Sequence, residues 1–383
     1  MKKYSLSSYR RARATLGILL WTLNAAAVSS PESRHASPGT SAPAFETVRF
    51  QSQLLGKTLP YNVILPRDYQ TSPRTRYQVL YLLHGFGGHY SDWATRTNLA
   101  DYAAEYRLIV VTPEGNNGWY TDSVTNPADK YESYILEELI PDVDRRFRTI
   151  QTRYARGIAG LSMGGYGALK FGLKRPDQFA FAASLSGATA TAAWTADDLK
   201  GMDAIRDSLF GVFGPVGSET RKKNDIFEIV RALTPARVAT LPYFYLDCGT
   251  EDFLIEMNQQ FAVLLRGKKV AHEYRELPGT HNWAYWDQQV QEVLRIAAQK
   301  MRLPHLRSGN RNARRSERSL LKRHAHPARD SHGRDVGATT SSRSQSSGSA
   351  DGCHHREVSR PARPAQLKVW QTVAVRPAET CRP

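Results

Sequence analysis

The stretch that decides the fold is Tyr154-Ala-Arg-Gly-Ile-Ala-Gly-Leu-Ser-Met-Gly-Gly165. Residues 154–161 form a nearly continuous apolar run, typical of a strand buried on both faces, and helical spacing follows over residues 164–174. Between them, Gly160-Leu-Ser162-Met-Gly164 has the Gly-x-Ser-x-Gly pattern of a very tight strand-to-helix turn, in which the flanking positions accept almost no side chain. The pattern predicts that the Ser162 hydroxyl stands above the edge of a sheet, beside the N–H groups that follow it.

A serine hydroxyl needs a base to attack near pH 7, and after such a turn the acid and the histidine come later in the chain. His281 meets this requirement, because it follows Gly279-Thr280 just past the last predicted strand. The other histidines before the tail either precede Ser162 or lie within that strand: His35, His84, His89 and His272. We therefore expect His281 to be the base.

The acid that orients the histidine is expected in Asp247-Cys-Gly-Thr-Glu-Asp252, at the end of the preceding strand. Asp247, Glu251 and Asp252 are all candidates. Asp252 is favoured because it lies in the loop beyond the glycine, whereas Asp247 is still in the strand. On this hypothesis Asp247 is a structural carboxylate that binds loop amides, and Glu251 is a solvated side chain.

A glycine-rich turn, His84-Gly-Phe-Gly-Gly88, follows the strand that ends at Leu83. Its free amides can face the nucleophile and stabilise an oxyanion. We expect the backbone N–H groups of Phe86 and Met163 to be the donors. The turn does not match a dinucleotide-binding fingerprint, because its third glycine is misplaced.

The rest of the core predicts an α/β fold. Residues 45–55 and 59–65 alternate as an antiparallel pair, and buried strands are expected at 77–83, 108–112, 154–161, 179–185, 243–246 and 271–277. Helical spacing separates them at 99–106, 131–147, 164–174, 253–265 and 283–301. This alternation predicts the α/β-hydrolase fold, a mainly parallel central sheet with helices on both faces. A small helical insertion is expected at about 188–240, with helices at 193–209 and 225–233, beyond the carboxyl ends of the strands.

The net charge of +16 is concentrated at the two ends of the 383-residue chain, with +5 on residues 1–40 and +11 on residues 301–383. A neutral core argues against a nucleic-acid-binding domain, which would carry a basic face on its folded part. Cys248 is the one cysteine of the core and is expected to be buried, so no disulfide framework or metal pair can be drawn. No metal and no cofactor are expected.

Residues 1–40 begin with basic residues, continue with an apolar run of about 15 residues and end in a Ser/Pro-rich linker, as a signal peptide does. The run is shorter than the ~20 residues that span a bilayer, so we expect export, by a general or twin-arginine route, rather than integral membrane association. Residues 41–301 form the predicted catalytic domain. Residues 302–383, rich in Arg, Ser, His, Pro and Gly, are expected to be a basic disordered tail.

Several of these motifs resemble the putative-esterase family of α/β-hydrolases, which includes esterase D (S-formylglutathione hydrolase), feruloyl and acetyl-xylan esterases, and mycolyltransferases. The resemblance covers roughly residues 44–300. It rests on Leu83-His-Gly-Phe-Gly-Gly88, Gly160-Leu-Ser-Met-Gly-Gly165, Asp247-Cys-Gly-Thr-Glu-Asp252, Gly279-Thr-His-Asn-Trp283 and Tyr131-Glu-Ser-Tyr134. The resemblance implies a triad of Ser162, Asp252 and His281.

Two differences from particular branches of the family narrow the choice of branch. Esterase D proteins typically have Leu-Thr-Cys where this chain has His84-Gly-Phe86, and mycolyltransferases usually have Glu where Asp252 stands. Aromatic side chains near the site, Trp119, Tyr120 and Trp283, are candidates to bind a sugar or an aromatic acyl group, although half or more of such residues are expected simply to pack.

The sequence thus predicts a serine carboxylesterase that hydrolyses short-chain or acylated-carbohydrate esters through an acyl-enzyme, with a small-molecule or polysaccharide ester as substrate. An acyltransferase or an S-formylglutathione hydrolase is the alternative within the fold. A non-catalytic protein that binds polyanions through its tail is the alternative from another class. The sequence does not indicate the oligomeric state.

Overall fold

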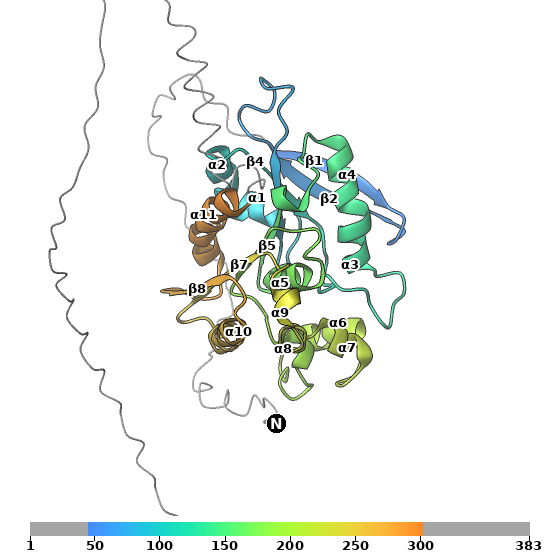
Figure 1. Cartoon of the computed structure of the whole chain (residues 1–383). Coiled ribbons are helices and arrows are strands. Elements are labelled where there is room, and N and C mark those ends of the chain that lie inside the picture. The colour runs from blue at the N-terminus through green and yellow to red at the C-terminus, as the bar shows by residue number, and fades with distance from the viewer. Residues whose placement is uncertain (1–44, 302–383) are drawn as a thin grey trace, which may run out of the picture. The chain divides into compact units, whose positions relative to one another are not determined.

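A computed structural model describes residues 45–301 of the protein. The sheet has eight strands in the order β1-β2-β4-β3-β5-β6-β7-β8 (Figure 1). The strands are β1 (Phe45–Ser52), β2 (Lys57–Ile64), β3 (Gln78–Leu83), β4 (Leu108–Pro113), β5 (Arg156–Leu161), β6 (Phe181–Leu185), β7 (Tyr243–Gly249) and β8 (His272–Leu277). Strands β3 to β8 run parallel, whereas β1 and β2 are antiparallel at one edge. The sheet is therefore mainly parallel, as the buried apolar runs predicted.

Helices cover both faces of this sheet. They are α1 (Asp92–Arg96), α2 (Leu99–Ala104), α3 (Tyr131–Ser133), the π-helical η2 (Tyr134–Leu139), α4 (Ile140–Arg146), α5 (Met163–Lys174), α6 (Asp203–Phe213), α7 (Glu219–Asn224), α8 (Ile226–Arg231), α9 (Pro235–Val238), α10 (Ile255–Gly267) and α11 (Trp283–Lys300), with 3₁₀ turns η3 (Arg153–Ala155) and η4 (Thr191–Ala193). This arrangement is the α/β-hydrolase fold.

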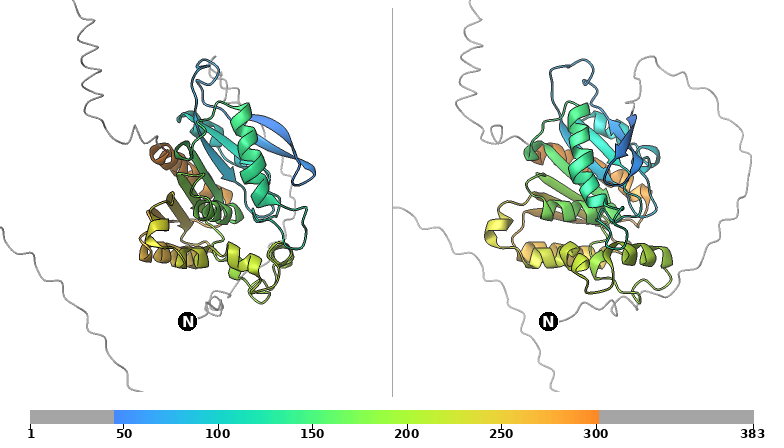
Figure 2. Two further views of the ribbon diagram at one scale, coloured as in Figure 1. Left: turned by 45° about the vertical axis from the view of Figure 1, so that its right-hand side comes forward. Right: turned by 90° about the vertical axis from the view of Figure 1, so that its right-hand side faces the viewer.

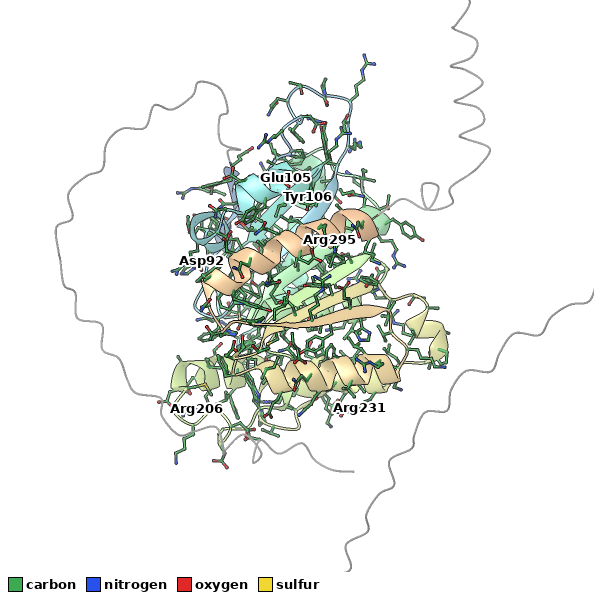
Figure 3. The ribbon with its side chains drawn as sticks, turned by 90° about the vertical axis from the view of Figure 1, so that its left-hand side faces the viewer. Asp92, Glu105, Tyr106, Arg206, Arg231 and Arg295 are labelled. Carbon is green, nitrogen blue, oxygen red and sulfur yellow. The ribbon has the colours of Figure 1, made fainter. Side chains whose placement is uncertain are left out.

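Two separate apolar layers hold the helices on the sheet. One layer packs α1, α2 and α11 against one face through residues such as Trp93, Leu99 and Val290. Figure 3 looks toward the β8 edge of the sheet, with the orange α11 above the strands and the yellow α10 below them. The other layer packs η2, α4, α5, α8 and α10 against the opposite face, with Tyr134, Phe171 and Phe261 at its centre. Burial on both faces explains why β3 to β7 carry apolar residues without polar alternation. The prediction of a buried strand at 271–277 is wrong, because β8 lies at the edge of the sheet and is only half-buried.

The segment between β6 and β7 holds the helices α6 to α9. Figure 2 shows the yellow-green helices of this segment beside α10, and α8 packs against both α10 and α5. The helix predicted at 193–209 is wrong in its bounds, because α6 begins only at Asp203. Gly201 adopts a left-handed φ of 82° just before it, and the side chains of Thr195 and Asp198 bond each other in a local turn instead of continuing a helix.

The predicted signal peptide and linker of residues 1–40 and the predicted tail of residues 302–383 lie outside the described residues. Within residues 45–301, no helix is long and apolar enough to cross a membrane.

Candidate active site

Ser162 sits at the turn between β5 and α5 with φ 52° and ψ −116°, a conformation that non-glycine residues rarely adopt. The glycines around it leave no room for side chains. A Cβ on Gly160 would lie 2.5 Å from the carbonyl carbon of Gly164, and a Cβ on Gly164 would lie 2.5 Å from the carbonyl oxygen of Leu83. Real Cβ atoms do not approach backbone atoms so closely. The Gly-x-Ser-x-Gly pattern is thus a steric requirement of this turn, as the sequence predicted.

Three side chains from three loops form one chain of hydrogen bonds at the carboxyl ends of the strands. His281 Nε2 lies 3.0 Å from Ser162 Oγ, and His281 Nδ1 lies 2.8 Å from Asp252 Oδ2. A carboxylate facing Nδ1 favours the tautomer with the proton on Nδ1, which leaves Nε2 to accept the serine proton. The Asp252 side chain is fully buried, whereas the His281 side chain is 18% exposed. The arrangement can make the Ser162 hydroxyl nucleophilic.

The loops that carry Asp252 and His281 are fastened to each other. Leu254 N–H donates to Asp252 Oδ1 at 2.9 Å, which fixes the carboxylate. Glu251 accepts from Gly279 N–H at 2.7 Å through its side chain and donates its own N–H to Gly279 O at 3.0 Å. The loop after β7 therefore holds the loop after β8 through polar contacts.

These contacts correct the predicted roles of the two neighbouring acids. Glu251 is not merely solvated, because its carboxylate accepts the Gly279 amide. Asp247 binds no loop amide and instead accepts from the Tyr285 hydroxyl of α11 at 3.1 Å. Burial raises the pKa of Asp247 to about 7. Both predicted roles fail because the Asp247 side chain is buried in the core, away from the loop amides, while Glu251 lies at the surface next to the following loop.

The glycine-rich turn after β3 lies against the serine, since a Cβ on Gly85 would be 3.4 Å from Ser162 Cβ. Among residues 45–301, the N–H groups of Phe86 and Met163 have no hydrogen-bond acceptor. Met163 is the first residue of α5, where backbone N–H groups have no partner within the helix. Both N–H groups are therefore available to an oxyanion.

His84 has a role that sequence reasoning missed when it excluded this residue as the base. It is buried, its Nε2 accepts from Gly115 N–H at 2.9 Å, and its Nδ1 lies 2.8 Å from Gly85 O. The first bond assigns the proton to Nδ1, which donates to Gly85 O. Gly85 O and Phe86 N–H lie on opposite sides of one planar peptide. His84 thus fixes the direction of the Phe86 N–H group.

The predicted substrate-binding aromatic residues are mostly inside the protein. Trp119 is 2% exposed, and its ring packs against Phe86 with centroids 5.8 Å apart. Tyr120 is fully buried and donates from its hydroxyl to His84 O at 3.0 Å. Trp283 is half-buried and packs edge-on against Trp93. Trp119 and Tyr120 offer almost no surface to a substrate, and both have left-handed φ values of 52° and 49° in the loop after β4.

A buried lysine connects that loop to α5, the helix that follows Ser162. Lys170 on α5 has no exposed surface, and its Nζ donates to Tyr120 O, to Thr121 Oγ1 and to Glu132 at 2.5, 2.7 and 2.7 Å. Burial lowers the pKa of Lys170 to about 8, although the Glu132 carboxylate opposes this shift. Lys170 therefore joins α5, α3 and the loop that carries Trp119.

The described part of the chain contains no group of three His, Cys, Asp or Glu side chains that could hold a metal ion. Cys248 is buried, as predicted, and its thiol is free.

The fold and the hydrogen bonds that link Ser162, His281 and Asp252 are typical of one class of protein, the α/β-hydrolases with a serine nucleophile. Within that class, the chain belongs to the Esterase family, whose model, described as Putative esterase, matches residues 52–296. The acetyl esterase of Caldicellulosiruptor saccharolyticus is 30% identical over an alignment of 258 residues, and the alignment covers 64% of this chain and 95% of the relative.

Solved structures agree with this membership. A ferulic acid esterase superposes with a TM-score of 0.59 and 27% identity, over 68% of this chain and 98% of that one. The fluorophosphonate-binding serine hydrolase F of Staphylococcus aureus also superposes with a TM-score of 0.59, at 28% identity, over 67% of this chain and 98% of its own. The chain is thus a hydrolase of the esterase family.

Proposed function

We propose that the protein is a serine carboxylesterase that works through an acyl-enzyme, with Ser162 as nucleophile, His281 as general base and Asp252 as the acid that orients His281. The observation that carries this proposal is the continuous hydrogen-bonded chain from Asp252 Oδ2 through the imidazole to Ser162 Oγ, at 2.8 and 3.0 Å. Family membership supports the same reaction class.

In the first step Ser162 Oγ forms a bond to the ester carbonyl carbon while His281 Nε2 takes the hydroxyl proton. The N–H groups of Phe86 and Met163 stabilise the negative charge on the carbonyl oxygen. The bond to the alcohol oxygen then breaks, and His281 returns the proton to the leaving alkoxide. In the second half of the reaction, water attacks the acyl carbonyl carbon while His281 Nε2 takes a proton from it. The bond to Ser162 Oγ then breaks, His281 returns the proton to Ser162, and the acid is released. Asp252 offsets the positive charge on the imidazole at each stage.

The substrate is a short-chain ester or an acylated carbohydrate, of the acetyl or feruloyl type. The acetyl esterase relative and the ferulic acid esterase structure support these acyl groups. Action on a polysaccharide and export remain predictions from the sequence, and the segment that predicts export lies outside the described residues.

Replacing Ser162 by Ala tests the proposal. The Ser162→Ala variant should lose three orders of magnitude or more in kcat for p-nitrophenyl acetate, because it removes the hydroxyl that lies against His281 Nε2. Ser72→Ala, in the loop between β2 and β3, is the control and should keep full activity. A fluorophosphonate should label the parent on the peptide that contains Ser162 and leave the Ser162→Ala variant unlabelled. Esterase activity that survives in the Ser162→Ala variant contradicts the proposal.

The product shows whether water is the acceptor. With glycerol or xylose added during hydrolysis, free acid as the main product supports an esterase, whereas a new ester as the main product indicates an acyltransferase that uses the same residues.

A further inference from the structure

Phe253 is the most exposed large hydrophobic side chain within residues 45–301, with 66% of its surface accessible. Its neighbours Asp252 and Leu254 are buried, at 2% and 3%. The backbone here is fixed, because Asp252 N–H donates to Gly249 O and Leu254 N–H donates to Asp252 Oδ1. The phenyl ring is therefore held in solvent at a defined position, although burying it would favour folding by about 2 kcal/mol.

The ring of Phe253 lies directly against the proposed general base. Its centroid is 4.8 Å from that of the His281 imidazole, with the ring planes inclined by 52°. The imidazole also contacts Trp286 edge-on at 4.9 Å, but Trp286 is only 6% exposed. Of the two aromatic rings on His281, Phe253 is the one that a substrate can reach.

The reaction decides which half of an ester meets this surface. His281 Nε2 gives its proton to the leaving alkoxide, so the alcohol oxygen must come within hydrogen-bonding distance of Nε2. The carbonyl oxygen must face the N–H groups of Phe86 and Met163 instead. The alcohol half of the ester therefore lies beside the imidazole and its neighbour Phe253. Trp119 and Tyr120, buried under the oxyanion turn, have no comparable exposed face.

We propose that Phe253 is a specificity-determining residue that binds the alcohol half of the substrate and favours esters whose alcohol is a flat ring. An aromatic ring or the C–H face of a pyranose can cover the exposed phenyl face, whereas a short alkyl alcohol covers little of it. This inference rests on the proposed function, since it uses His281 as the group that protonates the leaving alcohol.

Acetate esters of different alcohols provide the test, because they all form the same acetyl-enzyme. Phe253→Ala should lower kcat/KM about 5- to 20-fold for phenyl acetate, an acetylated xylopyranoside or both, and leave that for ethyl acetate unchanged. The rate at which acetyl-enzyme is hydrolysed, followed by mass spectrometry of quenched samples, should stay the same, since the alcohol has already left. The ring ester that responds identifies the alcohol as aromatic or carbohydrate.

Two further variants control for structural effects. Phe253→Tyr keeps the ring and should retain the preference of the parent for ring alcohols. Val263→Ala removes a side chain that is 64% exposed on α10 and should change none of the rates. Because the Phe253 side chain is mostly exposed, the melting temperature of Phe253→Ala should match that of Val263→Ala.

An equal loss of kcat/KM for all three acetates, slower hydrolysis of the acetyl-enzyme, or a shifted pH profile would show that Phe253 acts on His281 rather than on the alcohol, and would overturn the inference. No change with any ester would overturn it as well. These outcomes differ from failure of the proposed function, in which the parent protein itself would not form an acetyl-enzyme.

Discussion

The turn that carries Ser162 and the loop that carries Asp252 reach the same site by different physical means. The turn is held by exclusion, because a side chain at Gly160 or Gly164 would overlap backbone atoms. The loop is held mainly by hydrogen bonds, from Leu254 to Asp252 and between Glu251 and Gly279. Steric exclusion should make the turn intolerant of any added atom, whereas the polar loop should depend on which atoms donate and accept.

The largest effect is expected in the polar loop, on activity. Asp252→Asn keeps an oxygen that can accept from Leu254 N–H, but its amide donates to His281 Nδ1 and so places the ring proton on Nε2. That tautomer cannot accept from Ser162, and kcat/KM for p-nitrophenyl acetate should fall on the order of 10³- to 10⁴-fold. Stability, measured by urea unfolding, should be nearly unchanged. If Asp252→Asn also lowered the free energy of unfolding by about 4 kcal/mol, which is the equivalent of the predicted loss of activity, the loop would not be held as described.

The next effect tests exclusion at the turn. Gly164→Ala places a Cβ 2.5 Å from Leu83 O and 2.6 Å from His84 O, so the backbone must move. We expect a loss of about 3 kcal/mol in the free energy of unfolding, together with most of the activity. Gly267→Ala, where nothing lies within 4 Å of the added carbon, is the matched control and should cost nothing measurable. Equal stability of the two variants in urea unfolding would contradict steric control.

The smallest effect on activity concerns Asp247, the other aspartate at the end of the same strand. Burial raises the pKa of Asp247 to about 7 from an ordinary 3.8, so the folded protein binds this proton more tightly than the unfolded chain does. The stability that Asp247 contributes in acid is therefore lost as the pH rises from about 4 to about 7. Asp247→Asn has no such titration, so between pH 4.5 and pH 8 its free energy of unfolding should rise by about 3 kcal/mol relative to that of the parent.

Urea unfolding at the two pH values checks this expectation, and the activity of Asp247→Asn separates it from Asp252→Asn. The same Asp-to-Asn change should abolish most activity at residue 252 and spare it at residue 247. If the stability difference between Asp247→Asn and the parent is constant with pH, the Asp247 carboxyl does not titrate in this range.

The contrast also explains how much could be predicted from the sequence. Steric exclusion restricts a position to glycine, which is visible in the sequence, so Gly160 and Gly164 predicted the turn. The order of the following loops predicted that Asp252 and His281 would meet Ser162. Hydrogen bonds within a loop are harder to predict from the sequence, because any of several acidic side chains can accept a hydrogen bond from an amide N–H group. Accordingly, the loop-amide contact predicted for Asp247 is made by Glu251 instead, and Asp247 is buried.

Burial of the aromatic residues escaped prediction for a related reason. Trp119 and Tyr120 lie in a loop that follows a strand, where exposure is the usual expectation. Both residues adopt a left-handed φ although neither is glycine, so residue type did not signal that conformation. His84 was recognisable only as a poor candidate for the base, although its place immediately before the glycine-rich turn was a signal for a supporting role. The helix predicted at 253–265 begins two residues later, at Ile255, which leaves Phe253 in the loop.

Lys170 has a consequence for protein engineering. Its ammonium group has no access to solvent. From α5 it donates to Tyr120 and Thr121 in the segment after β4 and to Glu132 in α3. If the segment after β4 is replaced by that of a relative, the Lys170 ammonium group loses its acceptors unless the new segment also supplies them. A buried charge without partners is strongly destabilising. Chimeric enzymes built on this scaffold should therefore exchange Tyr120, Thr121, Glu132 and Lys170 as one unit.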